Sequence, residues 1–215
     1  MSRPPEVVPV RLSSILDPGC IVLDVGTGSK HDVLARLAAP ILELRPDLDA
    51  PAVVAELDRR EAESSTAIAD GIAIPHARPP VREAIAAFGR STAGVAFDSL
   101  DGKPTRLLFL LLSPLDNPSL HVAWLAHIAR VLSDAVTRSR LVDADSREQI
   151  LEVLREREAE LEAAQTGTDQ TTETDRTDQT KRSGQSEPSP QLPPAPPLSA
   201  MPPVRSGGPD RKGTT

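Results

Sequence analysis

Hydrophobic residues recur along the first three-quarters of the chain with two different spacings. Apolar positions at helical spacing predict helices over residues 29–42, 51–61, 119–132 and 146–161. Short, nearly continuous apolar runs predict buried strands or strand pieces over residues 20–25, 71–75, 84–97 and 106–113. Because strands alternate with helices, the pattern predicts a layered α/β domain that ends near residue 162.

Residues with turn and capping chemistry lie at the ends of these segments. Ser29 or Asp32 is expected to cap the first helix, and Ser146 with Gln149 three residues later forms a capping-box pattern for the last. Asp101 and Gly102 predict the turn before the longest apolar run. Capping and turn residues therefore support the predicted ends of these elements.

The composition changes after residue 162. Residues 163–215 contain a loosely repeated Thr-Asp-Gln-Thr and then nine prolines between Pro188 and Pro209, with almost no aliphatic side chains. Such a segment cannot bury enough apolar surface to offset the entropy of ordering it. We therefore expect a folded domain over 1–162 and a disordered low-complexity tail over 163–215, with a partner-binding polyproline segment as the alternative for the tail.

Charge and cysteine content exclude several classes of function. The net charge is −7, and the chain has three Phe, one Trp and no Tyr. It therefore lacks the basic surface and the aromatic stacking residues that are typical of nucleic-acid binding. The single Cys20 excludes an intrachain disulfide and a thiolate metal site, and no metal or cofactor is expected. No apolar run approaches a membrane span and no signal peptide is visible, so we expect a cytoplasmic protein without membrane insertion.

His76 stands out because of the segment that precedes it, Gly-Ile-Ala-Ile-Pro over residues 71–75. Pro75 has no N–H for a sheet ladder and fixes its own φ, so we expect the strand to stop there. The next side chain would then lie at the sheet edge on a stiff backbone, which suits a group that must be both exposed and aimed. An imidazole is partly neutral near pH 7, so one nitrogen can act as a nucleophile while a hydrogen bond orients the other.

Phosphoryl transfer to such a histidine requires cations or hydrogen-bond donors around the phosphoryl oxygens. The candidates are Arg60, with Arg59 as an alternative beside it, His121, and the hydroxyls of Ser65 and Thr66. The two other histidines, His31 and His127, are expected to be surface or core residues.

The residues that carry this chemistry form a recognisable set. Arg60-Glu61, Ser65-Thr66, the block that ends at His76, and His121 at a helix start resemble the IIA domains of the fructose–mannitol class of the bacterial phosphotransferase system. The nitrogen-regulatory IIA-like proteins belong to the same class. The resemblance covers about residues 10–155 and implies a three-layer α/β/α sandwich with a mixed β-sheet.

The resemblance also implies a role for each matching residue. His76 would accept a phosphoryl group from phosphorylated HPr or an HPr-like carrier, His121 would stabilise the phosphate, and Arg60 would neutralise its charge. Ser65 and Thr66 would bind the phosphate. The acceptor would be a sugar-specific IIB component, or, in a regulatory protein of the nitrogen type, protein targets that sense the phosphorylation state.

Two features depart from this reading. Ala67 and Ala69 replace residues that are usually Gly in the family, which would alter the loop if either position needed a positive φ. Residues 24–28 (Asp-Val-Gly-Thr-Gly), which follow a predicted strand, are the remote alternative: a nucleotide or S-adenosylmethionine site. Lys30 stands where a third glycine would be expected.

Overall fold

A mixed sheet forms the centre of the molecule. The computed structural model describes residues 11–178, with side chains through Gln165. A short 3-10 helix, Leu12–Ser14, precedes the first strand, and the strands are β1 (Leu16–Val22), β2 (Ile72–Ala73), β3 (His76–Ala77), β4 (Ile85–Val95) and β5 (Thr105–Leu112). The sheet order is β1-β4-β5-β2. Strand β3 also pairs with β5, nearer the carboxyl end of β5 than β2 does. The β4–β5 pair is antiparallel and the others are parallel, which confirms the predicted mixed sheet.

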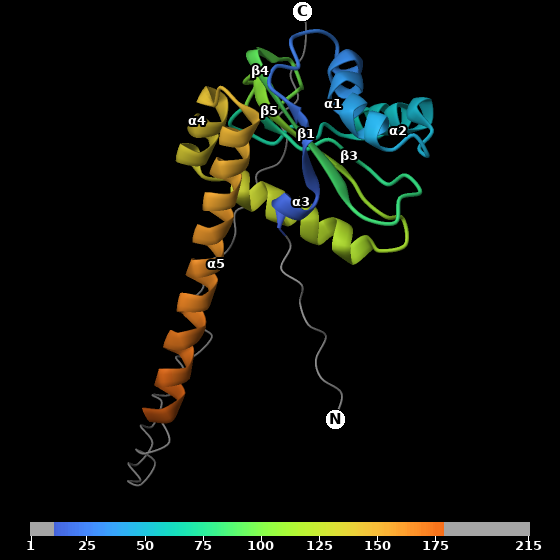
Figure 1. Ribbon diagram of the computed structural model, residues 1–215. Coiled ribbons are helices and arrows are strands. Elements are labelled where there is room, and N and C mark those ends of the chain that lie inside the picture. Colours follow the sequence, from blue (N-terminus) through green and yellow to red (C-terminus); the bar gives the residue numbers. More distant parts are fainter. Residues whose placement is uncertain (1–10, 179–215) are drawn as a thin grey trace, which may run out of the picture. The chain divides into compact units, whose positions relative to one another are not determined.

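Helices cover both faces of this sheet (Figure 1). They are α1 (Lys30–Leu44), α2 (Ala50–Glu63), α3 (Pro118–Leu132), α4 (Ala135–Asp143) and α5 (Arg147–Asp178). Neighbouring residues of β4 identify the two faces, because a Cβ on Gly89 would meet Leu37 of α1, whereas Arg90 donates to the carbonyls of Val142 and Ala144 at the end of α4. Helix α3 contacts α4 on that second side. The predicted three-layer α/β/α sandwich is confirmed.

Strand β5 is the centre of the core, as its sequence predicted. Residues 107–112 are buried on both faces, and Phe109 packs edge-on against Phe88 of β4 with the ring centroids 6.2 Å apart. A run without alternation is what a strand covered by helices on both sides requires. The strand therefore holds β4 on one side and the short β2 and β3 on the other.

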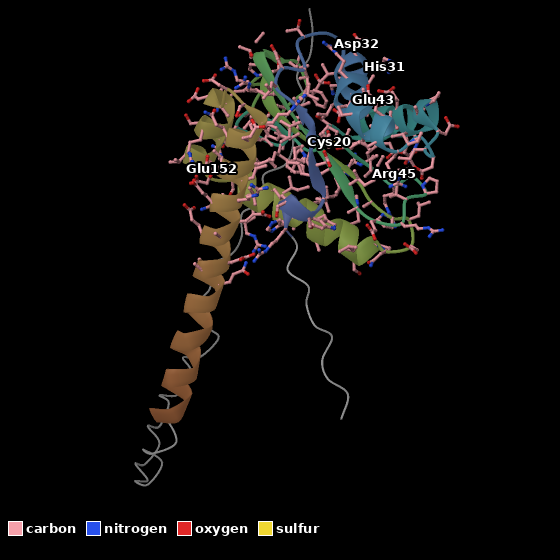
Figure 2. The ribbon with its side chains drawn as sticks, in the orientation of Figure 1. Cys20, His31, Asp32, Glu43, Arg45 and Glu152 are labelled. Atoms are coloured by element: carbon pink, nitrogen blue, oxygen red, sulfur yellow. The ribbon has the colours of Figure 1, made fainter. Side chains whose placement is uncertain are left out.

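The first helix begins where its capping residues predicted. Ser29 is the N-cap, its hydroxyl accepts from the backbone N–H of Asp32, and the Asp32 carboxylate accepts from the Ser29 N–H. The two candidates for the cap are thus the two halves of one capping box. Figure 2 shows Asp32 and His31 together at this end of α1.

A buried polar cluster fixes the N-terminal segment to the helical layer. Glu158 of α5 accepts from the backbone N–H of Leu12 at 2.5 Å and is bonded to Nε2 of His127 in α3 at 2.7 Å. Glu158 and His127 are both buried. His127, which the sequence placed either at the surface or in the core, is therefore a core residue with a carboxylate partner.

Several boundaries differ from those predicted. The first strand begins at Leu16 rather than Cys20, because Asp17-Pro18-Gly19 interrupts its pairing with β4 without ending it. The strand before His76 ends at Ala73, short of Pro75, and pairing with β5 resumes at His76 as the separate strand β3, which the sequence did not predict. Helix α4 was not predicted. Helix α5 ends at Asp178 rather than at Leu161.

The rest of the predicted tail, residues 179–215, lies outside the described residues. None of the described helices is long and apolar enough to cross a membrane.

Candidate functional site

His76 lies at the edge of the sheet in the first position of β3, where it pairs with Leu111. Its Nδ1 is 2.8 Å from the carbonyl oxygen of Ile74. A carbonyl can only accept, so Nδ1 carries the hydrogen and Nε2 of the neutral ring is left with a free lone pair. The Pro75 step between these residues allows the ring to fold back on its own backbone. The side chain is half-buried, so the ring is both exposed and fixed.

Arg60, in the last turn of α2, contacts the other ring nitrogen. Its Nε donates to Nε2 of His76 at 3.1 Å, and its Nη1 donates to the carbonyl of Ser64 at 3.0 Å. A guanidinium has only donors, so this contact independently requires an unprotonated Nε2. Burial lowers the pKa of His76, and the positive charge of Arg60 lowers that pKa further. His76 is therefore a neutral imidazole whose unprotonated Nε2 lies beside a cation.

The structure separates Arg60 from its neighbour Arg59. Arg59 is on the exposed face of α2, where its guanidinium pairs with Glu56 and Glu63. It is thereby committed to surface carboxylates one helical turn away on either side. Of the two arginines that the sequence left open, Arg60 is the one in contact with His76.

His121 lies next to His76. It lies in the first turn of α3, and the two ring centroids are 5.3 Å apart with the planes tilted by 56°. Its Nδ1 is 2.7 Å from the hydroxyl of Ser113, the first residue after β5. Burial lowers the pKa of His121 to about 4, and the positive charges of Arg78 and Arg60 contribute to the same effect. His121 is therefore neutral at pH 7.

Ser65 and Thr66 are near the site, but their hydroxyls are already bonded within the protein. The Ser65 hydroxyl donates to the carbonyl of Phe97 at 2.6 Å. Thr66 donates to Oε2 of Glu61 through both its backbone N–H, at 2.8 Å, and its hydroxyl, at 2.6 Å. Either hydroxyl would have to exchange its acceptor before it could bind a phosphate. The phosphate-binding role of this pair stays a prediction.

Glu61 is a residue of this region to which sequence reasoning gave no role. It is buried, and its other oxygen accepts from Nζ of Lys30 at 2.7 Å. The signal was present, because Val53, Leu57 and Glu61 are four residues apart on the buried face of α2. A carboxylate in an apolar stripe must find partners, and here it ties the N-terminus of α1 to the Thr66 segment that precedes β2.

Ala67 and Ala69 do not strain the loop. The non-glycine residues with positive φ in residues 11–178 are Asp70 (57°) and Asp98 (49°), so neither alanine occupies such a conformation. Ala67 instead forms an antiparallel bridge with Ala73. The residues of this loop with a positive φ are Asp70 and Gly71 (76°). Alanine at positions 67 and 69 therefore causes no backbone strain.

The other two histidines do not contact His76 and are each bonded to a carboxylate. His31 is exposed and 2.6 Å from a carboxylate oxygen of Asp58, which raises the pKa of His31. His127 is buried against Glu158. Within the described part of the chain, no group of three or more His, Cys, Asp and Glu side chains is placed to hold a metal ion.

The glycine loop over residues 24–28 is filled by the chain's own side chains. Arg36 donates to the carbonyl of Thr27 at 2.6 Å, and a Cβ on Gly26 would be 2.8 Å from its guanidinium. A Cβ on Gly28 would be 3.1 Å from the Asp32 carboxylate. A pyrophosphate there would have to displace Arg36 and approach a carboxylate, so the geometry does not favour the nucleotide alternative.

Comparison with known proteins identifies what this arrangement resembles. Residues 14–157 match the family model described as phosphoenolpyruvate-dependent sugar phosphotransferase system, EIIA 2. A nitrogen regulatory protein of Pseudomonas aeruginosa is 38% identical over 146 residues, which are 67% of this chain and 95% of that protein. The fructose-specific EIIABC component of Bacillus subtilis is 30% identical over 147 residues, which are 67% of this chain and 23% of that protein.

Solved structures show the same fold. The nitrogen regulatory protein IIA-Ntr of Neisseria meningitidis aligns with a TM-score of 0.63 and 35% identity over 66% of this chain and 98% of its own. IIA mannitol of Escherichia coli aligns with a TM-score of 0.55 and 20% identity over 64% of this chain and 97% of its own. Residues 14–157, which the family model matches, include His76, Arg60 and His121.

Proposed function

Because the chain belongs to the EIIA type 2 family of the phosphoenolpyruvate-dependent sugar phosphotransferase system, we propose that it is a cytoplasmic phosphocarrier with His76 as phosphoacceptor. The donor is a phosphorylated carrier protein, HPr or a relative of it. The observation that carries the proposal is the bonding of the His76 ring. Nδ1 is tied to the Ile74 carbonyl, and Nε2 is free of a hydrogen and faces Arg60.

The reaction follows from that bonding. Nε2 attacks the phosphorus in line, a bond between Nε2 and phosphorus forms, and the bond from phosphorus to the donor breaks. No proton has to leave His76, since the hydrogen stays on Nδ1. The bond to Ile74 holds the ring in this tautomer and delocalises part of the positive charge that develops on the imidazole.

Arg60 changes partner during the step. Its Nε occupies the lone pair of Nε2 in the resting protein, so attack requires that this bond be released. The guanidinium then remains beside the phosphoryl oxygens, where it neutralises their charge, while Nη1 is still anchored on Ser64. His121, neutral and 5.3 Å from the His76 ring, supplies a further hydrogen-bond donor.

The test is phosphorylation of the full chain with radiolabelled phosphoenolpyruvate, the first enzyme of the system and HPr. Wild type is expected to take up label, and His76→Ala is expected to take up none. His31→Ala is the matched control, since that histidine is exposed and belongs to no part of the site, and it should label like wild type. NMR of the ¹⁵N-labelled protein should find phosphorus on Nε2. Labelling of His76→Ala equal to wild type would overturn the proposal.

The destination of the phosphoryl group has two candidates. A sugar-specific IIB component is one, and a solved complex of IIA and phosphorylated IIB of the mannitol system has the same fold in its IIA part. The other is a regulatory role of the nitrogen type, in which protein targets sense the phosphorylation state. Regulatory relatives match at 38% and 33% identity along more than nine-tenths of their lengths. Fructose-specific relatives match at 37% and 30% identity along 71% and 23% of theirs, so sequence identity supports both candidates.

Two measurements separate the candidates. Phosphorylated protein is mixed with fructose- and mannitol-type IIB domains, and rapid loss of label to a IIB domain supports transport. For the regulatory role, His76→Glu and His76→Ala baits are compared for bound proteins, with the glutamate as a mimic of the added negative charge. A partner bound by one bait and not the other, with no discharge to IIB, supports regulation.

A further inference from the structure

Ser113, the first residue after β5, is completely buried beside the candidate site. Its backbone N–H donates to the carbonyl of Ala77, one residue beyond His76, at 3.2 Å. Its hydroxyl is 2.7 Å from Nδ1 of His121. The residue therefore connects the strand that carries His76 with the ring of His121, and the proposed transfer step above has not used it.

The direction of the Ser113–His121 bond follows from what each group can do. If Nδ1 of His121 donated, the hydroxyl hydrogen of Ser113 would need a separate acceptor. Across the described residues, the Ser113 hydroxyl makes no bond besides the one to His121. A hydroxyl hydrogen buried without an acceptor costs the desolvation of that group, whereas a hydroxyl oxygen that donates and accepts nothing costs less. The hydroxyl therefore donates, and Nδ1 of His121 accepts.

We propose that Ser113 is a positioning residue that holds His121 in the tautomer with its hydrogen on Nε2, and so sets which nitrogen of His121 serves the phosphoryl group on His76. A neutral imidazole has one N–H, so a bonded Nδ1 lone pair places that hydrogen on Nε2. The consequence for phosphate binding rests on the phosphocarrier function proposed above. Without Ser113, His121 could offer a lone pair instead of a donor to the phosphoryl oxygens, and its ring would lose its hydrogen-bonded anchor.

The tautomer can be measured before any phosphate is involved. Two-bond ¹H–¹⁵N correlation spectra of the ring nitrogens should show His121 of the wild-type protein with its hydrogen on Nε2 at pH 7. In Ser113→Ala the His121 signals should change toward a mixture of the two tautomers. Ser91→Ala is the control, because Ser91 is also fully buried and its hydroxyl bonds only to backbone groups, donating to the carbonyl of Gly26 and accepting from the N–H of Gly94. Its His121 signals should match wild type.

The transfer assay then tests the consequence. Ser113→Ala should slow phosphorylation of His76 about fivefold, the rate equivalent of one ordinary hydrogen bond. Ser113→Thr, which keeps the hydroxyl, should recover most of the rate. In a His121→Gln background, whose side chain has no ring tautomer, removal of the Ser113 hydroxyl should have no further effect.

The outcomes against the proposal are distinct. Wild-type His121 with its hydrogen on Nδ1, or His121 signals unchanged in Ser113→Ala, would overturn it. So would an equal loss of rate from Ser113→Ala with and without His121, since that is the result of a structural role alone. If His76 takes up no phosphate in any variant, the phosphocarrier function fails, while the ring spectra still decide whether Ser113 holds the tautomer.

Discussion

The low pKa of His121 makes a quantitative prediction about stability. A histidine whose pKa is lowered by folding binds fewer protons folded than unfolded, so it favours the folded state fully above its unfolded pKa. Here the pKa falls from 6.5 to about 4, chiefly because the ring is buried. That stability should be present above pH 6.5 and lost progressively as the pH falls toward 4. His121→Gln keeps a polar side chain of similar reach and removes the titration.

The size of the effect follows from the two pKa values. Between pH 7.5 and 5.5, a shift of this size would cost about 1.3 kcal/mol of unfolding free energy by linkage. The His121 ring is only partly buried, so solvent screening reduces the expected loss to roughly half, about 0.7 kcal/mol. With a urea m-value of about 2 kcal/mol/M, that is a difference of roughly 0.35 M in the unfolding midpoint.

The assay is urea unfolding of wild type and His121→Gln at pH 7.5, 6.5 and 5.5, followed by far-UV circular dichroism. Other groups titrate in both proteins, so the quantity of interest is the difference between their two pH dependences. Wild type should lose about 0.7 kcal/mol more than the variant on acidification. Parallel curves would refute the lowered pKa, and a wild type that gains stability relative to the variant would mean that folding raises it.

Three other predictions concern residues that the structure places in defined contacts. Arg60→Ala should slow phosphorylation of His76 by roughly a hundredfold, through loss of charge stabilisation, and should raise the pKa of His76 in an NMR titration; an unchanged rate would remove Arg60 from the site. Gly89→Ala should destabilise the fold by about 1–3 kcal/mol, because the new Cβ would be 2.7 Å from Leu37, and a normal urea midpoint would contradict this packing. Glu158→Ala should cost about 2–3 kcal/mol by leaving two buried donors without an acceptor, while His76 is still phosphorylated by the donor system.

The parts of the fold that the sequence predicted are those in which local pattern and final environment agree. The Leu and Phe run of residues 107–112 has one stable solution, a strand covered on both faces. Ser29 and Asp32 predict the start of α1 because their short side chains form hydrogen bonds with the free backbone N–H groups at a helix start. The motif predicted an arginine next to His76 and favoured Arg60, but the sequence left Arg59 open as an alternative.

The parts that the sequence missed depend on partners remote along the chain. Asp17-Pro18-Gly19 has the composition of a turn, yet the flanking residues pair with β4, and only that partner makes the segment part of a strand. Likewise, β3 forms because the last residues of β5, Leu111 and Leu112, remain available for pairing after the break at Pro75. Helix α4 buries only Thr137 and Leu141, which is too little periodicity to detect.

The break at Pro75 also governs how other polypeptides can approach the sheet. Next to the histidine, the outward backbone groups of the edge are used or absent: the Ile72 carbonyl and the Ile74 N–H bond to residues 66–68, and Pro75 has no N–H. The carbonyl of Ile74 is capped by the ring of His76. An unpaired edge is a template for aggregation and for strand addition, and this stretch offers none. In the proposed phosphocarrier function, a carrier protein that reaches His76 would therefore recognise side chains and shape, and repeated encounters would carry little risk of edge-to-edge association.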